Sequence, residues 1–361
     1  MKNLAFAGAM IASCTLAYPA FAHNVRADDH APIGVSADHT HKKGEVMFSL
    51  RYMHMAMSGN QVGTDGISND AIVTTIPNRF AGMPMQPPTL RLAPQSMAKD
   101  MVMLGAMYSP ADWITLVAML PYSERESNIT TYAGPTGATV LGDFQTNPKG
   151  IGDISAGAIF PLLGQKPATS DTGTELNLRA VVGMPTGSID ETGQTLSPMN
   201  MQMTMTMPYG MQSGSGTWDL MPALTLKQWA GKWSFGAQYA GTIRTGTNDN
   251  SYRLGDVHEG SLWASYLPAQ WISLSGRVRA QSTGRIEGLN PNVMGPVQTA
   301  NPDFSGGERV DLLGGVNFVA THGALAGHRL GIELGAPIYQ NVNGPQLTGD
   351  WMLTVGWQKA F

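Results

Sequence analysis

After residue 44 the chain is built from segments of about ten residues in which apolar and polar side chains alternate. The first segment, 45–57, carries Val46, Phe48, Leu50 and Tyr52 on one face and Met47, Ser49, Arg51 and Met53 on the other. Such alternation predicts a β-strand with two different faces, because successive side chains of a strand point to opposite sides. Twelve segments of this kind lie at 45–57, 100–108, 112–122, 152–162, 175–184, 218–227, 232–244, 257–267, 271–281, 309–320, 328–339 and 351–361.

The connections between these segments are short and long in turn. The short ones include 109–112, 228–231, 268–270 and 321–325, and the long ones are 58–99, 123–151, 187–217, 245–256, 282–308 and 341–350. Single-chain outer-membrane barrels show this asymmetry, with short periplasmic turns, long extracellular loops and both termini in the periplasm. The pattern therefore predicts an all-β fold, an antiparallel transmembrane β-barrel of about 12 strands. The alternative is a secreted β-sandwich.

The two predicted faces differ in chemistry as a barrel requires. The apolar face has aromatic residues near the segment ends, as an interfacial girdle does: Tyr108, Tyr122, Trp218, Trp233, Tyr339 and Trp351. The opposite face is polar or small, and its charged members are expected to line a wet lumen: Arg51, Glu175, Arg179, Arg277, Arg279, Asp311 and Glu333. The last strand ends on the aromatic Phe361, which resembles the assembly signal of bacterial outer-membrane proteins.

Residues 1–22 are expected to be a secretory signal peptide, with Lys2, an apolar core and Ala20-Phe21-Ala22 as the cleavage site. Lipidation at Cys14 is the competing possibility. Residues 23–44 then form a polar, His/Asp-rich periplasmic segment, which is also the obvious candidate to plug the lumen, and 45–361 form the barrel. The predicted location is the outer membrane of a Gram-negative cell, with outer-membrane lipid as a partner.

Composition excludes several classes of function. Charged residues make up 13% of the chain and the net charge is -4, so no basic surface is predicted that could bind nucleic acid. His258, His322 and His328 have no nucleophile motif near them, so no enzymatic activity is expected. Without cysteine after the signal peptide, any soft metal site would have to use thioether sulfur.

Methionine is concentrated in two regions, 47–119 and 199–221. Thioether sulfur suits Cu(I), and several methionines on one strand face can surround such an ion. The candidate metal ligands among them are Met53, Met55, Met57, Met101, Met103, Met107, Met199, Met201, Met203, Met205 and Met207. The simpler interpretation is that methionine is an adaptable filler of apolar gaps, which is the expectation for isolated Met294 and Met352.

Histidine is concentrated near the predicted start of the mature chain. His23, His30, His39 and His41 lie in the segment before the first strand, interspersed with aspartates. Imidazole and carboxylate groups at this density can bind Cu(II) or Zn(II), and cleavage after Ala22 would add a free amine beside the His23 imidazole. The alternative is a solvated tail whose histidines bind nothing. No cofactor is required by the sequence, and copper is the metal ion that the pattern favours.

Three stretches carry a resemblance to a known family. They are "DHAPIGVSADHTHKKGEVMFSLRYMHM" at 29–55, "MLGAMYSPADWITLVAMLPY" at 103–122 and "KGIGDISAGAIFPLL" at 149–163. They resemble bacterial proteins labelled transporters, which look related to the outer-membrane proteins associated with the meta-pathway of phenol degradation. The resemblance implies an outer-membrane barrel, and in the subgroup with a Met/His-rich opening it implies a connection to copper handling.

Three functions follow from these observations. In the first, the barrel binds or passes a small solute, above all a soft metal ion such as copper, through its methionine-rich sites. In the second, it is a passive channel for hydrophobic or aromatic organic compounds, and the methionines form an apolar path. In the third, it is a metal-binding surface barrel that transports nothing.

Overall fold

The computed structural model describes residues 26–36, 38–164 and 170–361. The predicted signal peptide, Cys14 and His23 lie outside these residues. One antiparallel sheet dominates the described chain and closes on itself, because β18 pairs with both β17 and β1. The wall contains β1 (Val46–Gly63), β3 (Leu92–Ala111), β4 (Ile114–Tyr132), β7 (Ser155–Leu163), β8 (Thr172–Gly183), β11 (Trp218–Ala230), β12 (Trp233–Thr245), β14 (Val257–Ala269), β15 (Ile272–Thr283), β17 (Gly307–Val319) and β18 (His328–Ala360).

β18 crosses the wall twice. Its first part pairs with β17 as far as Val342, and the part from Val342 to Ala360 pairs with β1. The chain folds back between them, since the indole nitrogen of Trp357 lies 3.0 Å from Nδ1 of His328. Counting β18 twice gives twelve passes through the wall among the described residues, as predicted. The all-β fold is a barrel, and the sandwich alternative is wrong.

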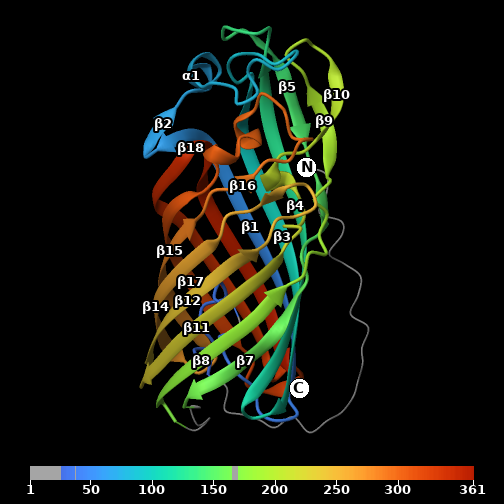
Figure 1. Cartoon of the computed structure of the whole chain (residues 1–361). Coiled ribbons are helices and arrows are strands. Elements are labelled where there is room, and N and C mark those ends of the chain that lie inside the picture. Colours follow the sequence, from blue (N-terminus) through green and yellow to red (C-terminus); the bar gives the residue numbers. More distant parts are fainter. Residues whose placement is uncertain (1–25, 37, 165–169) are drawn as a thin grey trace.

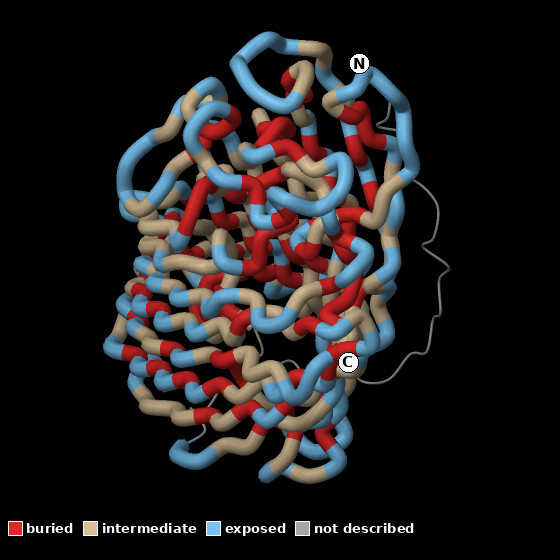
Figure 2. The backbone as a smooth tube through the Cα atoms, turned by 45° about the horizontal axis from the view of Figure 1, so that its top comes forward, coloured by how far each residue is buried: buried red, intermediate tan, exposed pale blue. Residues whose placement is uncertain are grey.

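Alternating burial along the strands sets the inside of the barrel apart from the outside (Figure 2). Large apolar side chains on the outer face are exposed on strands all around the barrel, for example Leu104, Leu262, Leu312 and Ile338. A continuous apolar outer band is what lipid requires. The aromatic residues predicted for the girdle all lie exposed on this face. The barrel is therefore a membrane barrel of the outer-membrane type. No helix among the described residues is long and apolar enough to cross a membrane.

The periplasmic turns are short because paired strands end directly beside them. Ala230 pairs with Trp233, so Gly231 and Lys232 alone make the turn between β11 and β12. Gly231 has φ of 65°, a conformation that residues with a Cβ adopt only with strain. The longer periplasmic turn before β18 contains the short helix η4 (Gly323–Leu325).

The extracellular end holds the long connections, which are partly folded (Figure 1). Their elements are β2 (Asp65–Ile67), α1 (Asn69–Thr75), β5 (Val140–Thr146), β6 (Lys149–Ile151), β9 (Thr192–Leu196), β10 (Gln202–Thr206), η1 (Tyr209–Met211), β13 (Tyr252–Arg253), β16 (Glu287–Gly288), η2 (Gln298–Ala300) and η3 (Pro302–Phe304). They enclose an apolar core of their own that includes Phe80, Tyr209, Tyr252 and Val297.

Three predicted loops differ from the structure. The loop predicted at 341–350 is wrong, because these residues continue β18 and pair with β1, as Gln346 does with Gln61. The loops predicted at 58–99 and 123–151 are shorter, because β1, β3 and β4 extend beyond the predicted segments at their extracellular ends. Apolar and polar residues do not alternate regularly in these extensions, so hydrophobic alternation could not reveal them.

The membrane face leads to the first prediction. Leu262 is 65% exposed near the middle of β14 and Leu325 is 63% exposed in a periplasmic turn, so their exposure is matched while their surroundings differ. We expect Leu262→Arg to make folding into lipid vesicles less favourable by about 2–4 kcal/mol, because the guanidinium would face hydrocarbon. Leu325→Arg should change it by less than about 1 kcal/mol. Equal effects in reversible folding titrations would contradict this placement of the bilayer.

Candidate functional site

Residues 26–36 and 38–44 pass inside the barrel and fill its periplasmic half, and we call them the plug (Figure 1). The plug is held by side chains from the barrel wall that donate to its carbonyl oxygens. Wall-to-plug bonds of this kind run from Trp229 to Asp28 at 3.0 Å, Lys227 to Asp29 at 3.1 Å, Asn177 to Asp38 at 3.1 Å and Arg329 to Arg26 at 2.9 Å. These donors come from β8, β11 and β18, so the plug is fixed from several sides.

The plug also fits the wall by shape. Ile33 packs against Gly331 and Gly356, and a Cβ on either glycine would lie 2.6–2.7 Å from an Ile33 carbon atom. Ala27 lies in an apolar cluster with Leu267 and Val319. Small wall residues therefore make the space that the larger plug side chain occupies, as in the close-packed interior of a soluble protein.

Charged residues predicted to line the lumen lie on the inner face and pair with one another. Arg277 and Glu333 form a bidentate pair at 2.7 and 3.0 Å, and Arg279 binds Asp311 at 2.6 Å. Lys227, which sequence reasoning missed, reaches both Glu175 and Asp38 at 3.4 Å. Arg51 donates to the Ser36 hydroxyl at 2.6 Å and Arg179 lies near the Ser36 carbonyl, so these two contact the plug.

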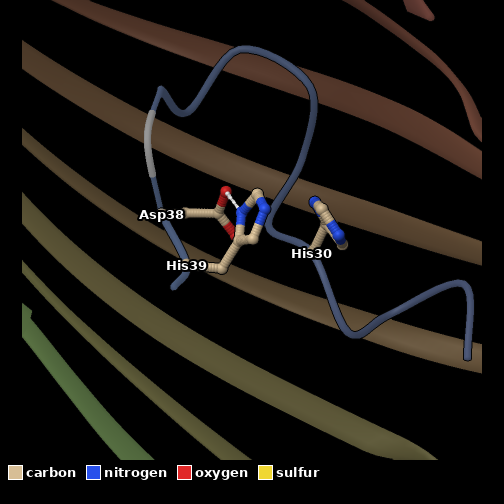
Figure 3. A group of neighbouring side chains, drawn as sticks. All are labelled: His30, Asp38 and His39. Atoms are coloured by element: carbon tan, nitrogen blue, oxygen red, sulfur yellow. Dashed lines mark hydrogen bonds and ion pairs between the residues drawn. The ribbon is translucent and has the colours of Figure 1, made fainter. Parts of the chain in front are cut away.

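The plug brings three predicted metal ligands together, His30, His39 and His41 (Figure 3 shows the first two with Asp38). The rings of His30 and His39 have centroids 3.9 Å apart, and Nε2 of His39 lies 3.2 Å from Nε2 of His41. Asp38 and His39 are buried at 4% and 8% exposure. The histidines are thus part of a packed lumen cluster, and the alternative of a solvated tail is wrong for the described residues.

The surroundings set the protonation of this cluster. Burial lowers the pKa of His39, and Asp38 only partly offsets it. Burial, with the nearby Arg329, lowers the pKa of His30 well below its usual range. Burial by itself would raise the pKa of Asp38, but His39 and Lys227 outweigh it and hold that pKa well below its usual range. The cluster at neutral pH therefore has neutral imidazoles at His30 and His39 beside a charged carboxylate.

The second site is an apolar pocket of about 610 Å³ at the extracellular end. Methionines are its most frequent lining residues, and we call it the methionine pocket; they are Met85, Met97, Met199, Met201, Met203, Met205, Met207, Met211 and Met294. Further lining comes from loop residues such as Ile129, Phe144 and Val297. Every predicted methionine of β10 and its flanks therefore reaches one pocket.

The predicted strand methionines continue from this pocket along the inner face of the wall. Across β1 and β3, Met57 pairs with Met97, Met53 with Met101 and Met47 with Met107. On the other side of β1, Met55 pairs with Met352. Directly paired residues of antiparallel strands have Cβ atoms about 4.5–5.5 Å apart, so their thioethers are neighbours. Met103 is opposite Arg51 on the same face.

One expectation about methionine changes here. Met207, a candidate metal ligand, is buried and contributes to the pocket wall. Met294 and Met352, expected as isolated gap fillers, line the pocket and the inner wall respectively, where Arg279 lies 3.0 Å from the Met352 sulfur. No local signal could reveal this, because the partners come from distant loops and from the strand that closes the barrel.

Comparisons with known proteins show the fold but no family. No protein family matches the sequence, and no curated protein matches it. An outer-membrane channel from Pseudomonas putida F1 has a similar structure, with 14% identity, a TM-score of 0.53, and coverage of 91% of this chain and 99% of that one.

Two further structures are similar over most of the chain. The toluene transporter TodX of P. putida has 9% identity, covers 89% of this chain and 91% of its own, and has a TM-score of 0.42. A FadL homologue of Pseudomonas aeruginosa has 8% identity, 88% and 90% coverage, and a TM-score of 0.40. The similarity to the first of these structures shows the fold, a closed β-barrel of the outer-membrane type.

The fit of the plug leads to the second prediction. Gly356→Val should push Ile33 out of place, costing about 1–3 kcal/mol as overpacked cores do, and should raise ion conductance in planar bilayers as the plug loosens. Ile33→Ala in the same chain should restore low conductance. Gly314→Val is the matched control, because a Cβ there meets nothing within 4 Å. Unchanged conductance in Gly356→Val would show that the plug does not depend on this contact.

Proposed function

We propose that this protein is an outer-membrane channel for small apolar or aromatic compounds, which bind in the methionine pocket. The observation that carries the proposal is the pocket itself, about 610 Å³ in volume and lined mainly by methionine and other apolar residues. Small-molecule sites are typically apolar cavities of about 300–1,000 Å³. Thioethers are flexible and favour contact with aromatic rings, so one pocket accommodates solutes of several shapes.

The proposed route leaves the pocket along the inner face of β1 and β3. Met97 lines the pocket and is the neighbour of Met57, and the pairs Met53–Met101 and Met47–Met107 follow toward the periplasm. An apolar solute gains by staying on these methionines, because the inner face elsewhere carries paired charges such as Arg277 and Glu333. Arg51 interrupts the row between Met53 and Met47. The plug lies at the periplasmic end of this route, so passage requires it to shift.

A second candidate is passage of a soft metal ion, with Cu(I) as the cargo. The neighbouring thioethers of Met53 and Met101 and of Met55 and Met352 favour it, because a soft ion needs several sulfur ligands close together. Both candidates depend on methionine side chains. They differ in whether the thioether sulfur or the apolar surface is needed for binding. A metal-binding barrel without transport is an outcome of the same experiment.

The third prediction separates these functions with matched substitutions in β10. Leucine at Met201, Met203 and Met205 keeps the apolar surface and removes the sulfur, whereas Met205→Glu places a carboxylate in the pocket. We expect liposomes with the leucine variant to take up radiolabelled toluene at the wild-type rate, and those with Met205→Glu at least about tenfold more slowly, because burying an unpaired carboxylate is costly.

Cu(I) titration against a competing chelator completes the test. Binding that disappears in the leucine variant, together with toluene uptake no faster than in empty liposomes, would replace the organic channel by the metal function. Cu(I) binding without Cu(I) flux would indicate the non-transporting barrel. Heat-modifiable electrophoretic mobility of each variant checks that the barrel has folded.

A further inference from the structure

The histidines of the plug are arranged in a way that the channel function does not require. Asp38, His39, His41 and Glu45 form a row in which each group contacts the next. Oδ1 of Asp38 lies 2.9 Å from Nδ1 of His39, the two Nε2 atoms of His39 and His41 lie 3.2 Å apart, and Nδ1 of His41 lies 3.3 Å from Oε2 of Glu45. The row has three contacts between ring nitrogens and their partners.

The two rings face each other through the nitrogens that the carboxylates do not hold. When Nδ1 of His39 donates to Asp38 and Nδ1 of His41 donates to Glu45, both Nε2 atoms direct a lone pair to the same point. A metal ion at that point would bond both lone pairs.

We propose that the plug binds a divalent transition metal of the zinc type between Nε2 of His39 and Nε2 of His41. Two nitrogens on one tetrahedral zinc, each about 2.0–2.1 Å from the ion, are about 3.3 Å apart. The observed separation of 3.2 Å matches that spacing before any ion is added. Each ring also has its Nδ1 held by a carboxylate, which is the arrangement that orients histidine ligands in metal sites.

His30 lies beside this pair. Its ring packs on His39, and one of its ring nitrogens lies within 4.8 Å of the ligand atoms of Asp38 and His39. Nδ1 of His30 is buried and has no hydrogen-bond partner among the described residues, which is costly unless something binds it. His30 therefore offers a further nitrogen next to His39, and the other positions of the ion are left to solvent.

Asp38 orients His39. Its Oδ1 accepts from His39, and its Oδ2 accepts from the Ala31 backbone at 2.9 Å and lies 3.4 Å from Lys227. These contacts hold the carboxylate in place beside the ring. Metal binding would join His39 to His41 and so hold this part of the plug in a folded form.

This site is independent of the proposed solute, and zinc binding tests it directly. The chain is purified with a chelator, dialysed, and titrated with Zn²⁺ and with Co²⁺, whose visible absorption reports coordination. We expect one Zn²⁺ per chain, and binding at least about 100-fold weaker in His39→Ala and in His41→Ala. Glu45→Gln should bind about 10–100-fold more weakly, as other variants that lose the group orienting a histidine ligand do. His30→Ala should weaken binding without abolishing it.

His322→Gln is the matched control, because His322 lies in an exposed periplasmic turn away from the plug. It should bind zinc like the wild type. Heat-modifiable mobility and circular dichroism identify any variant that fails to fold, and Glu45→Gln then replaces it, since this change keeps the side chain's size. Less than about 0.1 Zn²⁺ per chain in the wild type, or equal binding in wild type and His39→Ala, would overturn the site.

Discussion

The backbone of the wall has to satisfy its own hydrogen bonds, because lipid offers neither donors nor acceptors. An open sheet would leave one edge of β1 and one of β18 bare in the membrane, and their pairing from Met47–Ala360 to Gly63–Val342 removes both edges. Closure of the sheet also determines which residues are enclosed in the lumen. It turns one face of every strand to lipid and the other to a narrow space, so that Phe48 and Leu50 are exposed while Arg51 between Leu50 and Tyr52 is enclosed. The lumen residues owe their burial to this closure.

An enclosed polar face needs partners, and the barrel supplies them in two ways. Where inner charges can reach one another across neighbouring strands they pair, as Arg277 does with Glu333. Where they cannot, the plug offers backbone carbonyls, as Arg26 does to Arg329, so the plug replaces the water that an open pore would hold. The glycine at 34 marks how tight this fit is, because a Cβ there would lie 2.0 Å from Glu333. A plug fitted in this way cannot leave without leaving charges unpaired, which explains why solute passage would need a local shift of the plug and not its expulsion.

Much of the fold could be predicted from the sequence, because period-two alternation records which side of a closed sheet each residue faces. The strands around Arg179, Arg279 and Asp311 were found in this way, with the correct face turned inward. What could not be predicted depends on contacts between distant segments. Met294 and Phe144 reach the methionine pocket from different loops, and residues 341–350 are held as strand only by pairing with β1. His39 and His41 are candidate ligands from the sequence alone. The close approach of their Nε2 atoms follows from the path of the plug inside the lumen.

Methionine and histidine divide the interior into two chemically different halves. The thioethers extend from the extracellular pocket down β1 and β3 to Met47 and Met107, where they join a buried apolar cluster with Ile159. The imidazoles begin near the same level on the plug, since the His41 backbone is held by Thr115 of β4. Soft or apolar ligands suit the first half, and borderline metal ions suit the second. Because His41 belongs to the plug, a cation bound there would add to the free energy that holds the plug in place. A cation bound to the plug would therefore make it harder for a solute to pass from the methionine pocket into the periplasm.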